Sequence, residues 1–153
     1  MENNTESNTG LETLTFYNAA IVVADIDESI KWYTDALGFR LIDRHAIPTP
    51  GGELIMAFLE GAGMKIEMLQ NPRGQWIEAM VEDAKTDVAP TVIGSKALVF
   101  YVDDVSITTR ELEARGVDFL WKERYLAGDR LLCTMILDTD GTRVNIFQKD
   151  TVA

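Results

Sequence analysis

The chain has 153 residues, of which 46% are hydrophobic and 25% are charged, a composition typical of a soluble globular protein with one domain or two fused small modules. A net charge of −11 argues against nucleic-acid binding, and no apolar run is long enough to cross a membrane. The single cysteine, Cys133, excludes an intrachain disulfide and a cysteine-cluster zinc site, and it favours a cytoplasmic location. Residues 1–13 are polar, lack the apolar core of a secretory signal, and are expected to form a mobile tail.

The pattern of residues 14–70 predicts one strand, one helix and three further strands. Residues 14–24 are short, apolar and rich in β-branched side chains, which favours a strand buried on both faces. Asp25 or Asp27 is expected to cap the start of the helix, and Gly38 to end it in a left-handed conformation. The further strands are expected at 39–45, 53–59 and 64–69.

Residues 71–95 form a long connection, a length that is often functional. Within it, Ile77, Met80 and Val81 have helical spacing, and Trp76 stands beside them, so a short helix is expected. We expect this connection to contact a partner or to act as a cavity lid.

The plan of strand, helix and three strands then repeats over residues 96–149. A strand at 97–102 precedes a helix at 107–115 that ends at Gly116. Further strands are expected at 117–122, 131–137 and 144–148. A repeat on this scale decides the fold prediction, because each copy should form one supersecondary unit.

The spacing of chemically important positions supports the repeat. Asn18 and Ala97 each lie seven residues before an acidic helix cap. Glu67 lies 49 residues after Asn18, and Asn145 lies 48 residues after Ala97. The two copies therefore align almost residue for residue.

These motifs resemble the vicinal oxygen chelate superfamily, which includes glyoxalase I, bleomycin resistance proteins and extradiol dioxygenases. The resemblance covers about residues 14–148 and is carried by IVVADIDESIKWYTDALGF, LVFYVDDV, LEARGVDF and DTDGTRVNIFQ. It implies an α+β fold in which two β-α-β-β-β modules form a curved mixed sheet around a cavity. It also implies a homodimer. It does not specify the reaction, because a fold hosts many chemistries.

In metal-dependent relatives, the resemblance implies that ligands come from the first and fourth strands of each module. The matching positions here are Asn18, Glu67, Ala97 and Asn145. Only Glu67 is a strong ligand, and alanine cannot bind a metal at all. We therefore expect the metal site to be lost and no cofactor to be present.

Strand alternation predicts which side chains share a face with these positions. Glu67 is the candidate general base, and His45 is a second candidate because it is the only imidazole in the chain. The candidate ligand-binding residues are Asn18, Lys65, Tyr101, Arg143, Asn145, Phe147 and Trp76.

Each assignment has a structural alternative. Lys65 could extend to solvent while Glu67 only binds the ligand, and His45 could be merely exposed. Asn18 and Asn145 could satisfy each other or the backbone. Aromatic residues on a sheet face, such as Tyr101 and Phe147, are often plain core. The faces of Trp121 and Tyr125 stay open, while Trp32 and Tyr33 are expected in helix–sheet packing and Cys133 as a small apolar residue.

Three functions remain open from the sequence. The first is a metal-independent lyase, isomerase or cyclase acting on a small carbonyl or aromatic metabolite. The second is a non-catalytic protein that sequesters a drug or metabolite, for which the acidic charge would suit a cationic ligand. The third is a divalent-metal enzyme with an altered ligand set.

Overall fold

The computed structural model describes residues 15–85, 92–94, 96–126 and 131–151. The predicted tail at 1–13 and residues 86–91 of the long connection lie outside this range. In chain order the described elements are β1 (Ala19–Val22), α1 (Ile26–Leu37), β2 (Arg40–Thr49), β3 (Gly52–Gly61), β4 (Met64–Gln70), α2 (Glu78–Ala84), β5 (Ala97–Val102), α3 (Val105–Ala114), β6 (Phe119–Leu126), β7 (Leu131–Leu137), β8 (Arg143–Gln148) and a 3-10 turn (Lys149–Thr151).

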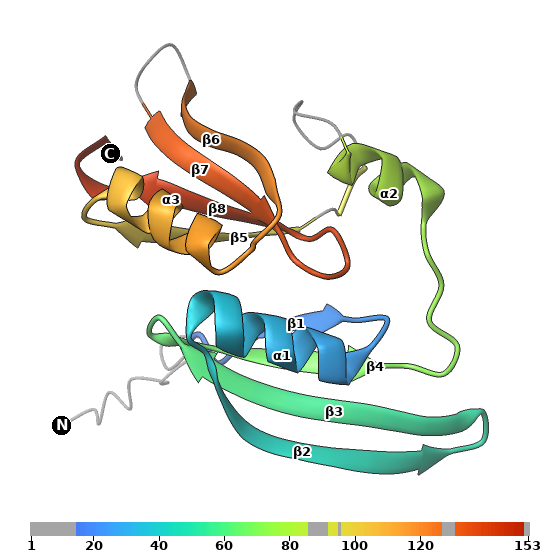
Figure 1. Ribbon diagram of the computed structural model, residues 1–153. Helices are drawn as coiled ribbons and strands as arrows, with labels where there is room; N and C mark the ends of the chain where they lie inside the picture. Colours follow the sequence, from blue (N-terminus) through green and yellow to red (C-terminus); the bar gives the residue numbers. More distant parts are fainter. Residues whose placement is uncertain (1–14, 86–91, 95, 127–130, 152–153) are drawn as a thin grey trace, which may run out of the picture.

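The strands form two four-stranded mixed sheets of the same topology. Their orders are β1-β4-β3-β2 and β5-β8-β7-β6. β1 pairs with β4, and β5 with β8, in parallel. The other neighbouring strands pair antiparallel. The edge strands β1 and β5 lie toward the middle of the molecule, with β2 and β6 at its two ends (Figure 1). This confirms the predicted α+β fold, with curved sheets that do not close. The division into two modules at residues 70 and 96 stays a prediction.

The helices begin at the predicted acidic residues. The Asp25 carboxylate accepts hydrogen bonds from the backbone N–H groups of Asp27 and Glu28, at 2.9 and 3.0 Å, so Asp25 is the cap of α1. Gly38 ends this helix with φ of 72°, as predicted. Asp104 caps α3 by accepting from the N–H of Ile107 at 2.9 Å, and α3 starts two residues earlier than expected.

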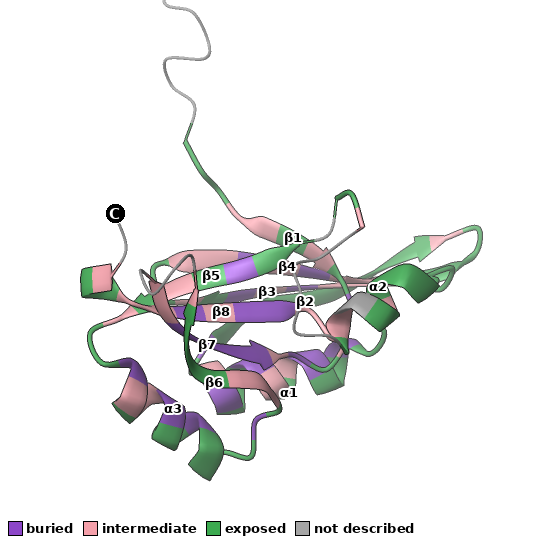
Figure 2. Cartoon of the chain, turned by 90° about the horizontal axis from the view of Figure 1, so that it is seen from above, coloured by how far each residue is buried: buried purple, intermediate pink, exposed green. Residues whose placement is uncertain are grey.

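Both long helices lie on the same side of the sheets (Figure 2). Alternate strand residues face them and form one core shared by the two sheets. The buried members are Val23, Ile26, Tyr33, Ala36, Phe39, Ala57, Leu59, Ile66, Met68, Leu98, Leu112, Val117, Ile136, Val144 and Ile146. The opposite sheet face is covered by neither α1 nor α3, and we call it the open face.

Two predictions about strands are corrected. β1 is buried on one face only, and Val22 on the open face is 63% exposed, because β1 is an edge strand with a helix on one side. The hairpin of β2 and β3 runs from Arg40 to Gly61 and is longer than predicted. Pro48 fits inside β2 because an edge strand has N–H positions that need no ladder partner.

Helix α1 is joined to the turn between β7 and β8 by three hydrogen bonds, an arrangement that we call the closed junction. The Tyr33 hydroxyl donates to Asp138 Oδ2 at 2.9 Å, and the Ser29 and Thr139 hydroxyls lie 3.1 Å apart. Just before α1, the Ala24 N–H donates to Asp140 Oδ2 at 3.2 Å. The predicted packing role of Tyr33 is confirmed, since the side chain is fully buried.

Three groups of the closed junction have raised pKa values, namely Tyr33, Asp138 and Asp140. Burial raises the pKa of the Asp138 carboxyl, although hydrogen bonds from Thr142 and Tyr33 partly oppose the shift. Burial also raises the pKa of Asp140, against the hydrogen bond from Ala24. The pKa of Tyr33 is raised, first by burial and then by the negative charge of Asp138.

No helix of the described residues is both long and apolar enough to span a bilayer.

Candidate functional site

Asn18 and Glu67 are joined by a hydrogen bond on the open face. Parallel pairing of β1 with β4 sets Ala20 opposite Glu67, which brings the residue two positions before Ala20 alongside the same carboxylate. Asn18 Nδ2 donates to Glu67 Oε2 at 2.9 Å, and both residues are half-buried. Two of the positions that the resemblance placed in one site therefore lie side by side, and the amide orients the carboxylate.

Lys65 lies two residues before Glu67 but takes part in a different contact. Its ammonium lies 5.5 Å from the centroid of the Tyr17 ring, within the range of a cation–π interaction. Cross-strand pairing places Lys65 opposite Glu60, and Glu67 opposite Phe58. The ammonium is thus held by an aromatic ring, while an aromatic ring also lies beside the carboxylate.

A groove runs along the junction of the edge strands β1 and β5. One part has a volume of about 520 Å³ and includes two of the positions that the repeat aligned, Asn18 and Ala97. A second part, of about 330 Å³, extends beneath α2. The two parts share Ala20, Ile21, Lys96 and Thr142, so they form one continuous groove.

The far part of the groove brings together two predicted ligand-binding residues, Trp76 and Arg143. Arg143 is buried at the start of β8, with only 5% of its surface exposed. Trp76 is well exposed and lies just before α2, which supplies Met80 and Ala84 to the same wall. The predicted short helix is therefore present, and it covers one end of the groove.

The remaining predicted ligand-binding residues lie on the open face of the second sheet. Tyr101 pairs with Phe147 across β5 and β8, and Asn145 lies in the next row between Val99 and Met135. Asn145 Oδ1 is buried and has no hydrogen-bond partner among the described residues. Because a buried acceptor without a donor is costly, this oxygen is suited to a donor group on a ligand.

The pairing of β6 with β7 also decides the face of Trp121, which the sequence left open. Trp121 pairs with Met135 and therefore shares the face of Asn145. Its indole N–H donates to Cys133 Sγ at 3.3 Å, and the guanidinium of Arg124 lies 5.2 Å from its ring centroid. Cys133 is fully buried, as predicted, and burial raises the pKa of its thiol.

His45 does not join Glu67. It lies on the edge strand β2, where its Nδ1 is 3.1 Å from Asp43 Oδ2, and both side chains are exposed. β3 separates β2 from β4, so two strand spacings of about 4.8 Å each intervene. An imidazole at that separation cannot exchange a proton directly with Glu67.

The residues at the four aligned positions do not fit a divalent metal. The amide of Asn18 turns its N–H toward Glu67, which uses a carboxylate oxygen that a metal would need. The third position, Ala97, has no donor atom, and the fourth, Asn145, offers only a neutral amide. Within the described ranges, no three His, Cys, Asp or Glu side chains gather closely enough to hold an ion.

Sequence reasoning missed the two polar residues that both parts of the groove share, Lys96 and Thr142. Lys96 immediately precedes β5, and Thr142 immediately precedes β8, and these two strands pair in parallel. The rule of alternating faces applies only to residues within a strand, so it did not identify Lys96 or Thr142. The pairing of Ala97 with Arg143 could have found them, because it places the residues before each strand side by side.

The element order and the two sheets of equal topology define a protein built from a repeated βαβββ unit, with a groove between β1 and β5. The model of the Glyoxalase/Bleomycin resistance protein/Dioxygenase superfamily matches residues 15–146, so the chain belongs to this family. Among characterised proteins it is similar to "Lactoylglutathione lyase" of Schizosaccharomyces pombe, with 24% identity over 144 residues that cover 88% of this chain and 47% of that protein.

Solved structures show the same fold. A glyoxalase family protein from Enterococcus faecalis superposes with a TM-score of 0.69 at 17% identity, covering 89% of this chain and 98% of the other. A glyoxalase I mutant from Zea mays superposes with a TM-score of 0.64 at 21% identity, covering 86% of this chain and 44% of the other. The chain thus spans about half the length of its Schizosaccharomyces and Zea relatives.

Proposed function

We propose that the chain is a metal-independent lyase or isomerase that acts on a small carbonyl or aromatic metabolite bound in the β1–β5 groove. The observation that carries the proposal is the hydrogen bond from Asn18 to Glu67, which fixes a half-buried carboxylate beside a groove. A carboxylate held in this way is a general base that can remove a proton next to a carbonyl. Asn18 is then a positioning residue.

The substrate is oriented by groups from both sheets. Lys96 and Arg143 line the groove and supply positive charge that steadies an oxyanion as it develops. Trp76 supplies an aromatic wall. His45 is not assigned a part in proton transfer, because it lies two strands away from Glu67.

The proposal includes a homodimer that completes the site. Val22, Val99 and Tyr101 on the open face each expose more than half of their surface, an apolar area that an identical chain would cover. Pairing the first sheet of one chain with the second sheet of another would bring Glu67 toward Asn145 of the partner subunit. The two-fold greater length of two relatives is consistent with such a doubled unit. The cytoplasmic location stays a prediction.

Glu67→Gln tests the enzyme assignment, with Glu60→Gln on the neighbouring strand as a matched control. We expect Glu67→Gln to keep ligand affinity and lose turnover by about 100-fold or more, the usual effect of removing a general base. Elemental analysis of the purified protein should find no stoichiometric metal. A divalent ion at full occupancy would replace this proposal by the altered-ligand metal enzyme.

A non-catalytic binding protein is the second candidate. The unpartnered Asn145 oxygen and the aromatic side chains of the second sheet favour it. They form a surface that can bind a ligand but that adds no acid or base to Glu67. If no turnover is found and Glu67→Gln weakens binding, this function replaces the first. A cationic ligand would be favoured by the net charge of −11.

A further inference from the structure

The repeat creates a second place where a helix of one sheet meets a turn of the other, and we call it the open junction. Tyr33 is the eighth residue after the cap of α1, and the eighth after the cap of α3 is Leu112. Opposite α3 is the turn between β3 and β4, where Ala62 and two glycines replace the acidic turn of the closed junction. Smaller side chains on both sides leave space unfilled.

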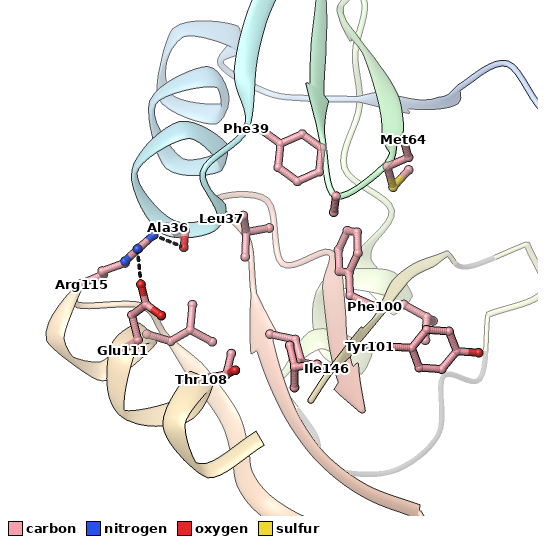
Figure 3. A pocket seen from close by; sticks show the side chains of 14 residues that line it. Ala36, Leu37, Phe39, Met64, Phe100, Tyr101, Thr108, Glu111, Arg115 and Ile146 are labelled. Carbon is pink, nitrogen blue, oxygen red and sulfur yellow. Dashed lines mark hydrogen bonds and ion pairs between the residues drawn. The ribbon is translucent and has the colours of Figure 1, made fainter. Parts of the chain in front are cut away.

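The space at the open junction is a cavity of about 580 Å³. Leu37, Phe39 and Met64 line it from the first sheet and its helix, and Phe100 and Ile146 line it from the second (Figure 3). The Tyr101 ring points away from this space in Figure 3. The volume is that of a site for a small organic molecule, and apolar walls are usual for one.

Two charged residues stand at one end of the cavity, Glu111 in α3 and Arg115 at its C-terminal cap. Arg115 Nη1 donates to the carbonyl oxygens of Ala36 and Asp35 at 3.0 and 3.2 Å, and its Nη2 donates to Glu111. The guanidinium is thereby held against the C-terminal end of α1. A carboxylate accepts more than one hydrogen bond, so Glu111 keeps capacity for a donor from the cavity.

We propose that the open junction binds a one- or two-ring aromatic molecule that carries a hydroxyl or amino donor. The closed junction shows what fills the equivalent space, namely a tyrosine ring whose hydroxyl donates to a carboxylate. A phenolic ligand supplies the same two features at the open junction. Its ring packs against the wall formed by Phe39 and Phe100, which contact each other edge to face with centroids 6.2 Å apart, and its donor reaches Glu111.

The charge of the protein agrees with this class of ligand. The net charge of −11 disfavours carboxylates and phosphates, whereas neutral phenols and arylamines carry no such penalty. The proposed site is separate from the β1–β5 groove, and none of its lining residues lines that groove. It therefore does not depend on the proposed catalytic function.

The first test uses 4-fluorophenol as the probe, with 4-fluoroanisole as the matched molecule that cannot donate. We expect ¹⁹F NMR titration to give a dissociation constant of about 1 mM for 4-fluorophenol, a weak affinity suited to so small a molecule. The anisole should bind about tenfold more weakly, because a hydrogen bond to a charged group is lost. Nuclear Overhauser effects from the probe to the Met64 methyl group should locate it. Their absence at saturating probe overturns the proposal.

The second test blocks the cavity from α3. Thr108→Trp places a large ring in the cavity, while Ile107→Trp adds the same ring at an exposed neighbouring position that does not line it. We expect only Thr108→Trp to abolish probe binding. Equal binding by the two variants overturns the proposal, and if Thr108→Trp fails to fold, the Met64 contacts of the unaltered protein decide.

The third test separates the carboxylate from the walls. Glu111→Gln should bring the affinities of 4-fluorophenol and 4-fluoroanisole to within about twofold of each other, since the charged acceptor is removed. Glu113→Gln removes the same charge from the exposed side of α3 and should keep the tenfold preference. A preference retained in Glu111→Gln overturns the assigned acceptor. Glu67→Gln should leave probe binding unchanged, which keeps this result independent of the catalytic proposal.

Discussion

At the closed junction, Tyr33 of α1 fills the space beside the β7–β8 turn, whereas at the open junction Leu112 of α3 leaves a cavity beside the β3–β4 turn. Both junctions join a helix of one sheet to a turn of the other. Tyr33 is fully buried and bonded to a carboxylate, while the equivalent position on α3 is aliphatic. The two copies of the repeat therefore share a backbone arrangement but differ in the side chains at the junctions.

The chemistry of the turns explains the difference. Asp138 accepts hydrogen bonds from the N–H groups of Asp140 and Thr142 at 2.9 and 2.7 Å, so its carboxylate is held in place to receive the Tyr33 hydroxyl. The β3–β4 turn is Gly61, Ala62 and Gly63, which have no side chain that can reach a helix. A repeated scaffold can thus use one junction for stability and leave the other to hold a ligand.

The largest expected effect is that of Tyr33→Leu, which makes the closed junction resemble the open one. We expect a loss of about 3 kcal/mol in the free energy of unfolding, because a buried carboxylate loses its donor and a cavity opens. Urea denaturation measures the change, with the exposed Tyr125→Leu as control and an expected effect within about 0.5 kcal/mol. A loss below about 1 kcal/mol would show that the two junctions are energetically equivalent.

The next prediction concerns pH and Asp138. Burial raises the pKa of this carboxyl in the folded protein, so folding favours its protonated form. Its contribution to stability is complete below the ordinary aspartate pKa of about 4 and is lost as the pH rises through the raised value. Asp138→Asn cannot ionise, and we expect wild-type stability to fall relative to this variant as the pH rises above about 4.

Denaturation midpoints measured across this pH range check the Asp138 prediction. Asp103→Asn removes the same charge at an exposed site and separates the effect of burial from that of net charge. Parallel pH profiles for wild type and Asp138→Asn would contradict the prediction. Burial keeps the pKa of Asp140 raised in both proteins, but the part of that shift caused by the Asp138 charge is lost in Asp138→Asn, which adds to the expected difference.

A smaller effect is expected for Gly61→Ala at the open junction. A Cβ at this position would lie 2.8 to 3.0 Å from carbons of the Phe39 ring, so the ring must move. Overpacking costs about 1 to 3 kcal/mol in a filled core, and we expect about 1 here because the ring can shift into the cavity. Affinity for 4-fluorophenol should fall with it. Unchanged affinity would place Phe39 outside the binding site.

The smallest effect is expected for Arg115→Lys. Lysine cannot hold two carbonyl oxygens and Glu111 in one planar arrangement, but the arginine side chain is 38% exposed, so the loss should be about 0.5 kcal/mol. Arg110→Lys, on the exposed side of the same helix, is the control. A loss above about 2 kcal/mol would make this contact, and not the closed junction, the main hydrogen-bonded link between the two halves of the chain.

Most of the fold was predictable because local chemistry specifies it. Asp25 and Gly38 bound α1 as expected, since a carboxylate cap and a left-handed glycine are needed wherever a helix begins and ends. The extended hairpin was not predictable from its residues. Pro48 and Gly52 read as a loop, and they fit in strands because β2 is an edge and β3 pairs with it.

The candidate site was predictable only in part. Strand alternation is a local rule, and it predicted only which neighbours in the same strand share a face with Asn18 or with Glu67. The hydrogen bond between these two residues depends on the pairing of β1 with β4. The distance of His45 depends on β3 being inserted between β2 and β4, which no local pattern reveals. Lys96 and Thr142 come together through the pairing of β5 with β8, again a long-range event.

The sequence by itself determined the repeat, the helix limits and the loss of strong ligands at Asn18 and Ala97, because residue type and spacing are local properties. Only the tertiary structure decided that the two sheets meet at β1 and β5 and that one junction between them is filled and the other hollow. Whether Tyr33 meets a carboxylate, and Leu112 meets a cavity, depends on turns more than 45 residues away in the chain. Contacts of that range depend on how the whole chain packs, which residue spacing does not encode.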